Sequence, residues 1–205
     1  MELCPGGTLA QLIHPPRGQE AVFTNITLRA RVRAALDIVA CLQYLHSSNV
    51  LHRDVKPSNC LLSSVLAAGS TEIPPVKLGD LGLARPSAQE MSRRVGTLIY
   101  MAPELMEGED YGFSVDVYSS GMLLYELITG LVPFSTSGDR LRNDVAFVLA
   151  VSMGERPNLD NTMPPCAVGE DLRSIIESSW SEEPGSRPTA CTLGEKLSSV
   201  WNAME

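Results

Sequence analysis

The interpretation of this sequence rests on residues 50–62, which read VLHRDVKPSNCLL. This short polar segment lies between an apolar pattern of helical period and an apolar run typical of a strand. It brings together Asp54, Lys56 and Asn59. An Asp can accept a proton, a Lys can neutralise a phosphate, and an Asn carbonyl oxygen can bind a hard cation. One loop therefore holds a base, a positive charge and a metal ligand, a combination that indicates phosphoryl transfer.

Residues 52–59 (HRDVKPSN) resemble the catalytic loop of protein kinases, and further motifs follow in the order of that family. Residues 80–82 (DLG) resemble Asp-Phe-Gly, with Leu in place of Phe. The other similar motifs are MAPE at 101–104 (family Ala-Pro-Glu), DVYSSG at 116–121 (Asp-x-Trp-Ser-x-Gly) and EPGSRPT at 183–189 (Asp-Pro-x-x-Arg-Pro-Thr). Trp180, just before the last motif, resembles the tyrosine-kinase-like branch of Ser/Thr kinases. The resemblance covers nearly the whole chain.

This resemblance implies a protein serine/threonine kinase that uses ATP and Mg²⁺ and acts on Ser or Thr residues of a protein substrate. Asp54 would orient the substrate hydroxyl and accept its proton, and Lys56 would contact the transferring phosphoryl group. Asn59 and Asp80 would hold Mg²⁺. Lys56 and Thr97 together imply Ser/Thr rather than Tyr acceptors.

Several roles outside the catalytic loop also follow from the resemblance alone. Residues 1–9 would form the hinge, where backbone groups near Glu2 and Cys4 bind adenine. Residues 80–104 would form the activation segment, and Arg53 would receive a phosphate placed on that segment through charge-assisted hydrogen bonds.

Two carboxylates in the motifs are expected to have specific partners. Glu104 would pair with Arg187 and tie the far end of the activation segment to the core. Residues 114–130 are apolar on nearly every side, which predicts a buried helix, capped by Ser114 and ended by Gly130. Asp116 would then be buried near the start of this helix and would need hydrogen-bond donors. The resemblance implies that backbone N–H groups of the catalytic loop are these donors.

Apolar periodicity predicts a mainly helical chain with one pair of strands. A helix is expected from Thr27 to about His46, where it leads into the catalytic loop. The strands are expected at 60–62 and 76–78, with a surface insertion at 63–75, and further helices at 140–151, 170–180 and 189–201.

Composition favours a single intracellular domain. The chain has 205 residues, of which 44% are hydrophobic, enough to bury one core. The formal net charge of −8 argues against a nucleic-acid partner, because phosphate backbones require a basic surface. The five cysteines lack Cys-x-x-Cys spacing and indicate free thiols. We see no signal sequence and no membrane segment, so the expected location is cytoplasmic.

The expected fold class is a mainly α, protein-kinase-like C-terminal lobe in which a short β-hairpin carries the catalytic and metal-binding loops. The family's Gly-rich loop, its Val-Ala-x-Lys lysine and the glutamate that pairs with this lysine are not found, which predicts that the N-terminal β-lobe is absent. Residues 1–205 would form one kinase domain, with a hinge (1–9), a catalytic loop (50–62), an activation segment (80–104) and a helical subdomain (114–205). Without the β-lobe, this chain alone would transfer phosphate poorly.

Two other functions stay open at this point. The chain could be a catalytically inactive, kinase-like binding or scaffold module that keeps the fold and has lost phosphate transfer. It could also be a Mg²⁺-dependent phosphohydrolase that uses Asp54 and Asp80, although the other motifs would then be unexplained. The intact set of Asp54, Lys56, Asn59 and Asp80 favours the kinase.

Overall fold

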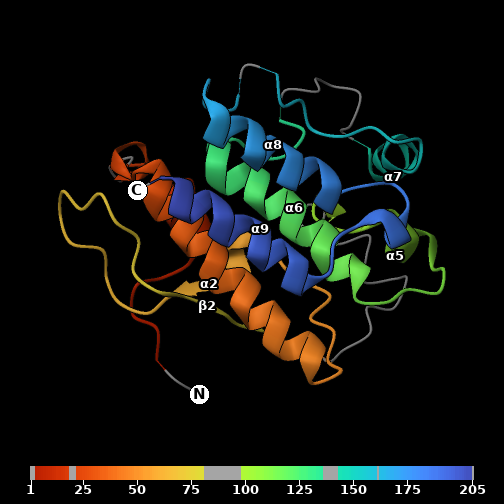
Figure 1. Ribbon diagram of the computed structural model, residues 1–205, viewed down its shortest axis with the longest axis horizontal. Coiled ribbons are helices and arrows are strands. Elements are labelled where there is room, and N and C mark those ends of the chain that lie inside the picture. Colours follow the sequence, from red (N-terminus) through yellow and green to blue (C-terminus); the bar gives the residue numbers. More distant parts are fainter. Residues whose placement is uncertain (1–2, 19–21, 81–97, 136–142, 161, 205) are drawn as a thin grey trace.

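The part of the chain that the structure describes folds into helices and one two-stranded antiparallel sheet (Figure 1). The computed structural model describes residues 3–18, 22–80, 98–135, 143–160 and 162–204. The α-helices are α1 (Leu9–Ile13), α2 (Leu28–Ser47), α5 (Pro103–Glu107), α6 (Ser114–Thr129), α7 (Asp144–Ser152), α8 (Ala167–Ser179) and α9 (Ala190–Ala203). The strands are β1 (Cys60–Leu62) and β2 (Val76–Leu78), and three short 3-10 turns are η1 (Val22–Asn25), η2 (Pro57–Asn59) and η4 (Pro184–Ser186).

Helix α6 is the buried centre of the fold. Every residue from 115 to 128 is buried, as the apolar pattern on all sides of this helix predicts. Helices α2 and α8 pack against α6, and α9 packs against both α2 and α8. These four helices run side by side in Figure 1. Gly130 ends α6 with φ 74, a left-handed conformation that favours glycine.

The start of α6 differs from the prediction, because Ser114 is the first helical residue and not the cap. Phe113 occupies the cap position and makes no side-chain capping bond. The first N–H groups instead have backbone partners in the preceding turn, where Val115 donates to Gly112 O (3.3 Å) and Asp116 donates to Phe113 O (3.2 Å). These bonds satisfy groups that a side-chain cap would otherwise serve.

Helix α2 leads into the candidate catalytic loop at the centre of the fold. It begins after Thr27, whose Oγ1 accepts a hydrogen bond from the Ala30 N–H at 3.1 Å, and it ends at Ser47, close to the predicted boundary. Its buried residues include Val32 and Leu42. Just beyond the helix, Asn49 adopts φ 58, so the chain turns sharply there.

The two strands pair where the sequence predicts them, in a register that sets Cys60 opposite Leu78 and Leu62 opposite Val76. Their connection, residues 63–75, is much longer than a tight hairpin turn requires. Because the strands are antiparallel, the residue before β1 and the residue after β2 lie at the same end of the hairpin. This end carries the candidate site.

The C-terminal helices lie close to their predicted ranges. Helix α8 begins at Ala167, and α9 follows Thr189, whose Oγ1 accepts a hydrogen bond from the Thr192 N–H at 3.1 Å. Helix α7 begins at Asp144, and residues 136–142 lie outside the described residues. Across the described ranges, no helix combines the length and the hydropathy needed to cross a bilayer.

Candidate active site

Asp116 anchors the start of the catalytic loop. Its side chain is fully buried at the N-terminal end of α6. The His52 N–H donates to Asp116 Oδ2 at 2.9 Å, and the Arg53 N–H donates to Oδ1 at 2.7 Å. His46, near the end of α2, places its Nε2 atom 2.9 Å from Oδ2. A buried carboxylate is stable only with such partners, and here they fix the backbone just before Asp54.

Arg53 is held in a conformation that is uncommon for a non-glycine residue, with φ 66. The hydrogen bond from its N–H to Asp116 helps to offset this strain. Its guanidinium carbon lies 5.6 Å from the centroid of the Tyr111 ring. The Arg53 Nε atom is buried and has no hydrogen-bond partner among the described residues. The phosphate-receiving role of Arg53 stays a prediction.

Two polar side chains of this loop donate hydrogen bonds to the same carboxylate oxygen of Asp54. Lys56 Nζ donates to Asp54 Oδ2 at 2.7 Å, and Asn59 Nδ2 donates to the same oxygen at 2.9 Å. Asn59 Nδ2 also donates to the Asp54 backbone carbonyl at 2.8 Å. The side chains of Asp54 and Lys56 are 19% and 12% exposed, so the pair is shielded but within reach of a substrate. Since both bonds end on Oδ2, Oδ1 can accept a hydrogen bond from an incoming hydroxyl.

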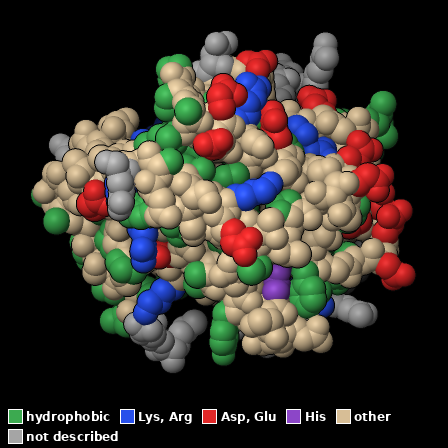
Figure 2. All heavy atoms as spheres, viewed as in Figure 1, with side chains coloured by type: hydrophobic (Ala, Val, Ile, Leu, Met, Phe, Trp, Pro, Cys, Tyr) green, Lys and Arg blue, Asp and Glu red, His purple; other side chains and the backbone are tan. Residues whose placement is uncertain are grey.

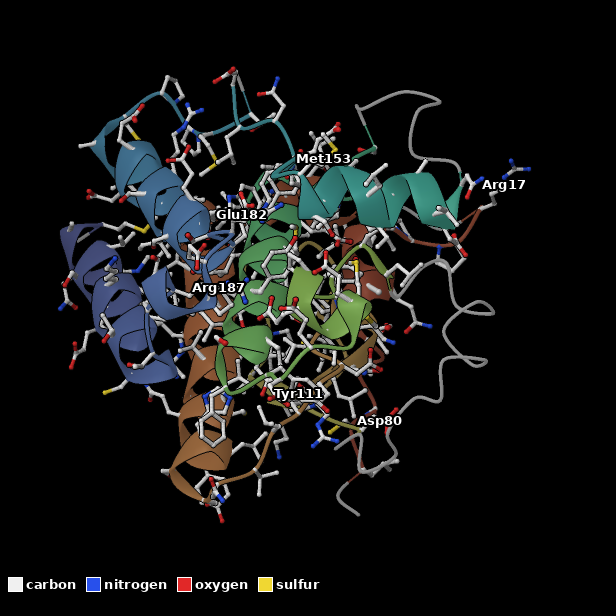
Figure 3. The ribbon with its side chains drawn as sticks, turned by 90° about the vertical axis from the view of Figure 1, so that its right-hand side faces the viewer. Arg17, Asp80, Tyr111, Met153, Glu182 and Arg187 are labelled. Carbon is white, nitrogen blue, oxygen red and sulfur yellow. The ribbon has the colours of Figure 1, made fainter. Side chains whose placement is uncertain are left out.

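Asp80 and Asn59 lie at the same end of the β1–β2 hairpin. The Gly79 N–H donates to the Asn59 backbone carbonyl at 2.8 Å, and His52 Nε2 lies 2.9 Å from the Gly79 carbonyl oxygen. Asp80 follows directly, is exposed, and has φ 53 (Figure 3). The Asp80 carboxylate therefore emerges from the hairpin end that also carries Asn59.

These two side chains fit Mg²⁺. This ion prefers oxygen ligands and is commonly bound by one or two carboxylates together with phosphate oxygens and water. Asp80 offers a carboxylate. Asn59 offers Oδ1, because its Nδ2 is directed to Asp54. Both candidate ligand atoms are oxygens, as Mg²⁺, the cation that the resemblance implies, prefers.

Glu104 and Arg187 form a buried, bidentate ion pair. Arg187 Nη1 donates to Glu104 Oε1 at 2.5 Å and Nη2 donates to Oε2 at 3.0 Å. Arg187 Nε also donates to the Ser181 carbonyl at 2.8 Å. The guanidinium lies 4.9 Å from the centroid of Tyr118, a side chain whose burial raises its pKa to about 12. This pair joins α5 to the segment between α8 and α9.

Glu126 is a further buried carboxylate, nearly three turns of α6 beyond Asp116. The Tyr100 hydroxyl donates to Glu126 Oε2, and His14 Nε2 lies 2.9 Å from Oε1. Burial raises the pKa of Glu126, and the hydrogen bonds from Tyr100 and His14 counter this only in part. The three residues tie the end of α1 and the chain before α5 to the central helix.

Replacing Glu126 by Gln is expected to change the pH dependence of stability. A carboxyl group with a raised folded-state pKa stabilises the fold below its unfolded pKa, about 4.3, and this contribution is lost as pH rises through the folded pKa. The free energy of unfolding of the wild type should therefore fall relative to that of Glu126→Gln as pH increases across this range. Urea unfolding at a series of pH values measures it, and parallel profiles would contradict the assignment.

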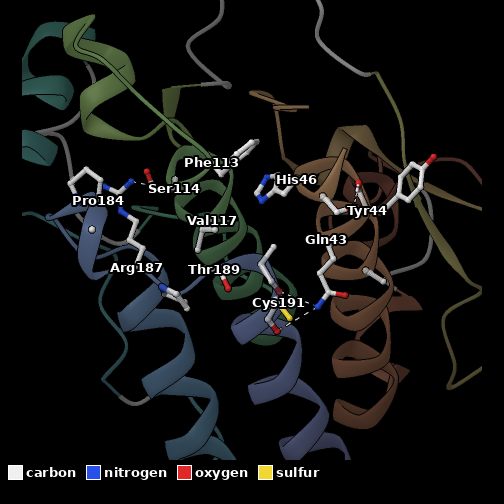
Figure 4. Close-up of a pocket in the computed structure, with 15 residues that line it drawn as sticks. Gln43, Tyr44, His46, Phe113, Ser114, Val117, Pro184, Arg187, Thr189 and Cys191 are labelled. Carbon is white, nitrogen blue, oxygen red and sulfur yellow. Dashed lines mark hydrogen bonds between the residues drawn. The ribbon is translucent and has the colours of Figure 1, made fainter. Parts of the chain in front are cut away.

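A groove of about 800 Å³ lies beside the anchor of the catalytic loop, between the ends of α2, α6 and α9 (Figure 4). Tyr44, Phe113 and Pro184 contribute to its largely apolar lining, together with His46. The rings of His46 and Phe113 are 4.7 Å apart between centroids. The lining includes neither Asp54 nor the two candidate metal ligands, so the groove is separate from the candidate active site.

The candidate hinge is only partly described. Cys4 lies in a segment that runs along β1, where the Gly6 N–H donates to the Leu62 carbonyl at 3.2 Å and the Leu62 N–H donates to the Gly7 carbonyl at 2.9 Å. Glu2 lies outside the described residues. So do Thr97 and the part of the candidate activation segment at 81–97. The roles of these residues stay predictions.

The sequence did not predict three polar residues that contact the buried carboxylates of α6. His46 contacts Asp116, and His14 and Tyr100 contact Glu126. Each makes its contact across a long stretch of chain, so no local spacing pointed to the pairing. One signal was present, because Glu126 is a charged residue in the apolar C-terminal half of a helix that is predicted to be buried. A charge in a buried helix requires a partner.

The family model for the protein kinase domain matches residues 1–197. A probable serine/threonine-protein kinase of Dictyostelium discoideum is 34% identical over 192 residues, which are 92% of this chain and 13% of that protein. Serine/threonine-protein kinase STY46 of Arabidopsis thaliana is 32% identical over 201 residues, 97% of this chain and 31% of the relative. A dual serine/threonine and tyrosine protein kinase of Pimephales promelas is 31% identical over 203 residues, 97% of this chain and 21% of the relative. The chain thus spans less than a third of each of these proteins.

The expectation of a C-terminal lobe with its N-terminal β-lobe absent is wrong. The match to the kinase domain begins at residue 1 and runs to residue 197, so it does not single out one lobe. The expectation rested on short motifs that were not found, and a missing motif does not define the extent of a fold. The described residues form a kinase-like fold of helices with one two-stranded sheet. The expectation of poor phosphate transfer by this chain loses its basis as well.

The geometry and the comparisons agree. The candidate catalytic loop is anchored by a buried carboxylate, and its Asp54 contacts a lysine and an asparagine. The next loop presents an aspartate at the same hairpin end. The family model for the protein kinase domain matches residues 1–197, which is nearly the whole sequence. The chain belongs to the protein kinase family.

Proposed function

We propose that this protein is a serine/threonine kinase that transfers the γ-phosphate of ATP to hydroxyl groups of protein substrates. The observation that carries this proposal is the convergence of Lys56 Nζ and Asn59 Nδ2 on a single oxygen of Asp54. A phosphohydrolase or a scaffold module would not require this arrangement. The cytoplasmic location predicted from the sequence, and the division into subregions, stay predictions.

In the proposed reaction, the substrate hydroxyl donates its hydrogen bond to Asp54 Oδ1. Its oxygen attacks the γ-phosphorus, a new O–P bond forms, and the bond between the γ-phosphorus and the bridging oxygen of ADP breaks. The hydroxyl proton passes to Asp54. Lys56, which already contacts Oδ2, lies close enough to offset the negative charge of the transferring group.

Asn59 and Asp80 would hold Mg²⁺, which supplies charge neutralisation for the phosphate oxygens. The hydrogen bond between Gly79 and Asn59 fixes the distance between the two loops. Positioning is the main demand of phosphoryl transfer, because little covalent chemistry is required of the protein.

Serine and threonine are the proposed acceptors for two reasons. Lys56 and Thr97 match the pattern of Ser/Thr-directed members of the family. The relatives are named serine/threonine kinases, and one is named a dual serine/threonine and tyrosine kinase. The relatives are much longer than this chain, so we do not assign their substrates to it.

Replacing Asp80 by Asn is expected to lower kcat by about 10²–10³-fold and to raise the Mg²⁺ concentration needed for half-maximal transfer. The variant keeps the size of the side chain and removes its charge. Because Asp80 is exposed, the free energy of unfolding should hardly change. Mg²⁺ titrations of activity, and calorimetric titration of the chain with a Mg²⁺–ATP analogue, measure the two effects.

The matched control is Glu72→Gln, which removes an exposed carboxylate from the connection between the strands. It should leave the Mg²⁺ dependence unchanged. An unchanged Mg²⁺ dependence in Asp80→Asn would contradict the assignment of Asp80 as a metal ligand.

A further inference from the structure

Helix α7 is apolar on all sides but buried on only one. Its sequence, DVAFVLAVS, has apolar residues at seven consecutive positions. Such a helix is normally buried all round. Of its residues, Phe147 and Val151 are buried. Phe147 packs edge-on against Phe134, with ring centroids 5.1 Å apart, and this contact holds the helix on the domain.

The opposite side of α7 carries a row of exposed large apolar side chains, Val145, Leu149 and Met153, which we call the α7 strip. Their exposed fractions are 75%, 61% and 77%. The spacing of four residues sets them in line along one side of the helix. Met153 belongs to this helical surface, because its N–H donates to the Leu149 carbonyl at 3.0 Å. Single exposed apolar residues are ordinary, but an aligned set marks an interaction surface.

Carboxylates border the strip at its C-terminal end. Glu155 lies two residues beyond Met153 and is exposed. The Glu182 carboxylate lies against the same turn, since a Cβ atom added at Gly154 would be 3.1 Å from its Oε2 (Figure 3). Helix α5 packs against α7 and ends in the exposed Glu107. Figure 2 shows Asp and Glu side chains gathered along the edge of the molecule where α5 and α7 lie in Figure 1.

The basic side chain beside this turn does not offset the negative charge at the surface. Arg156 is directed inward, where its Nε donates to the Trp180 carbonyl at 2.8 Å and its Nη1 donates to the Val151 carbonyl at 2.9 Å. The end of the strip that holds Leu149 and Met153 therefore combines apolar side chains with carboxylates.

We propose that the α7 strip binds an amphipathic segment of a partner protein, whose apolar residues cover Leu149 and Met153 and whose lysine or arginine residues meet the surrounding carboxylates. The apolar contact supplies affinity and the opposite charges supply orientation. A second copy of this chain is disfavoured as the occupant, because each copy carries a formal net charge of −8 and would bring its own acidic border to the contact. This binding does not depend on the proposed kinase activity.

The test uses two synthetic helical peptides of equal length that share one stripe of leucines. One peptide has lysines at its remaining positions and the other has glutamates. Fluorescence anisotropy with the full chain should show that the lysine peptide binds and that the glutamate peptide binds at least about tenfold more weakly. Leu149→Ser combined with Met153→Ser should weaken binding of the lysine peptide by about tenfold or more, since each buried apolar side chain contributes substantially.

Two sets of variants make the result specific. Val65→Ser removes an exposed apolar side chain from the connection between the strands and should leave binding unchanged. Glu155→Gln with Glu182→Gln should weaken binding of the lysine peptide and reduce its salt dependence. The proposal is overturned if the lysine peptide does not bind, if the strip variants bind it as the wild type does, or if both peptides bind equally. It is also overturned if sedimentation shows a dimer that the strip variants dissociate.

Discussion

Replacing Asp54 by Asn is expected to lower kcat for phosphate transfer by about 10²–10⁴-fold, the usual contribution of a general base. The carboxylate is the group that accepts the proton of the substrate hydroxyl in this account. Asn has nearly the same shape, and its amide oxygen can still accept the hydrogen bonds from Lys56 and Asn59 that now end on Oδ2. The loss should therefore appear in kcat, with little change in KM for ATP.

Structural damage is separated from chemistry by two measurements. The free energy of unfolding of Asp54→Asn should stay close to that of the wild type, because the anchor at Asp116 is untouched. Ser58→Ala alters an exposed residue of the same loop and should keep wild-type kcat. If Asp54→Asn keeps wild-type kcat while folded, Asp54 is not the base.

Replacing Arg187 by Met is expected to destabilise the fold by about 3–5 kcal/mol, because it leaves the Glu104 carboxylate buried without its partner. The Arg187 side chain is fully buried and that of Glu104 is 6% exposed. Arg187 also donates to the carbonyls of Ser114, Ser181 and Glu182, at 3.2, 2.8 and 3.2 Å. These carbonyls lose a donor in the variant as well. Urea unfolding measures the free energy of unfolding.

The double variant Glu104→Leu with Arg187→Met should recover part of the lost stability, because no uncompensated charge remains. Recovery should be incomplete, since the three backbone carbonyls still lack their donor. Arg173→Met is the control. Arg173 pairs with Asp160 and Glu177 at the surface, so its loss should cost less than about 1 kcal/mol. Equal costs for Arg187→Met and Arg173→Met would contradict the role given to the buried pair.

Elements with strong apolar periodicity could be predicted from the sequence. Helix α2 after Thr27 and the strands at 60–62 and 76–78 lie where the pattern places them. The burial of α6 on all sides followed from its composition. These features are local, so the sequence contains the information that determines them.

Features that depend on contacts between distant segments could not be predicted. The bond between His46 and Asp116 joins α2 to α6, and the network at Glu126 joins three separate segments. The cap expected at Ser114 failed because the backbone of the preceding turn already satisfies the first N–H groups. The exposure of the α7 strip could not be predicted either, because an apolar sequence does not show which side of a helix the domain covers.

The most direct test of the kinase assignment is the transfer of labelled γ-phosphate from ATP, with Mg²⁺, to a protein substrate such as casein, followed by analysis of the labelled amino acids. The purified chain is compared with Asp54→Asn as the blank. We predict label on serine and threonine with the wild type, and a signal near background with the variant. Label on tyrosine alone, equal label with both proteins, or release of inorganic phosphate without labelled substrate would contradict the account.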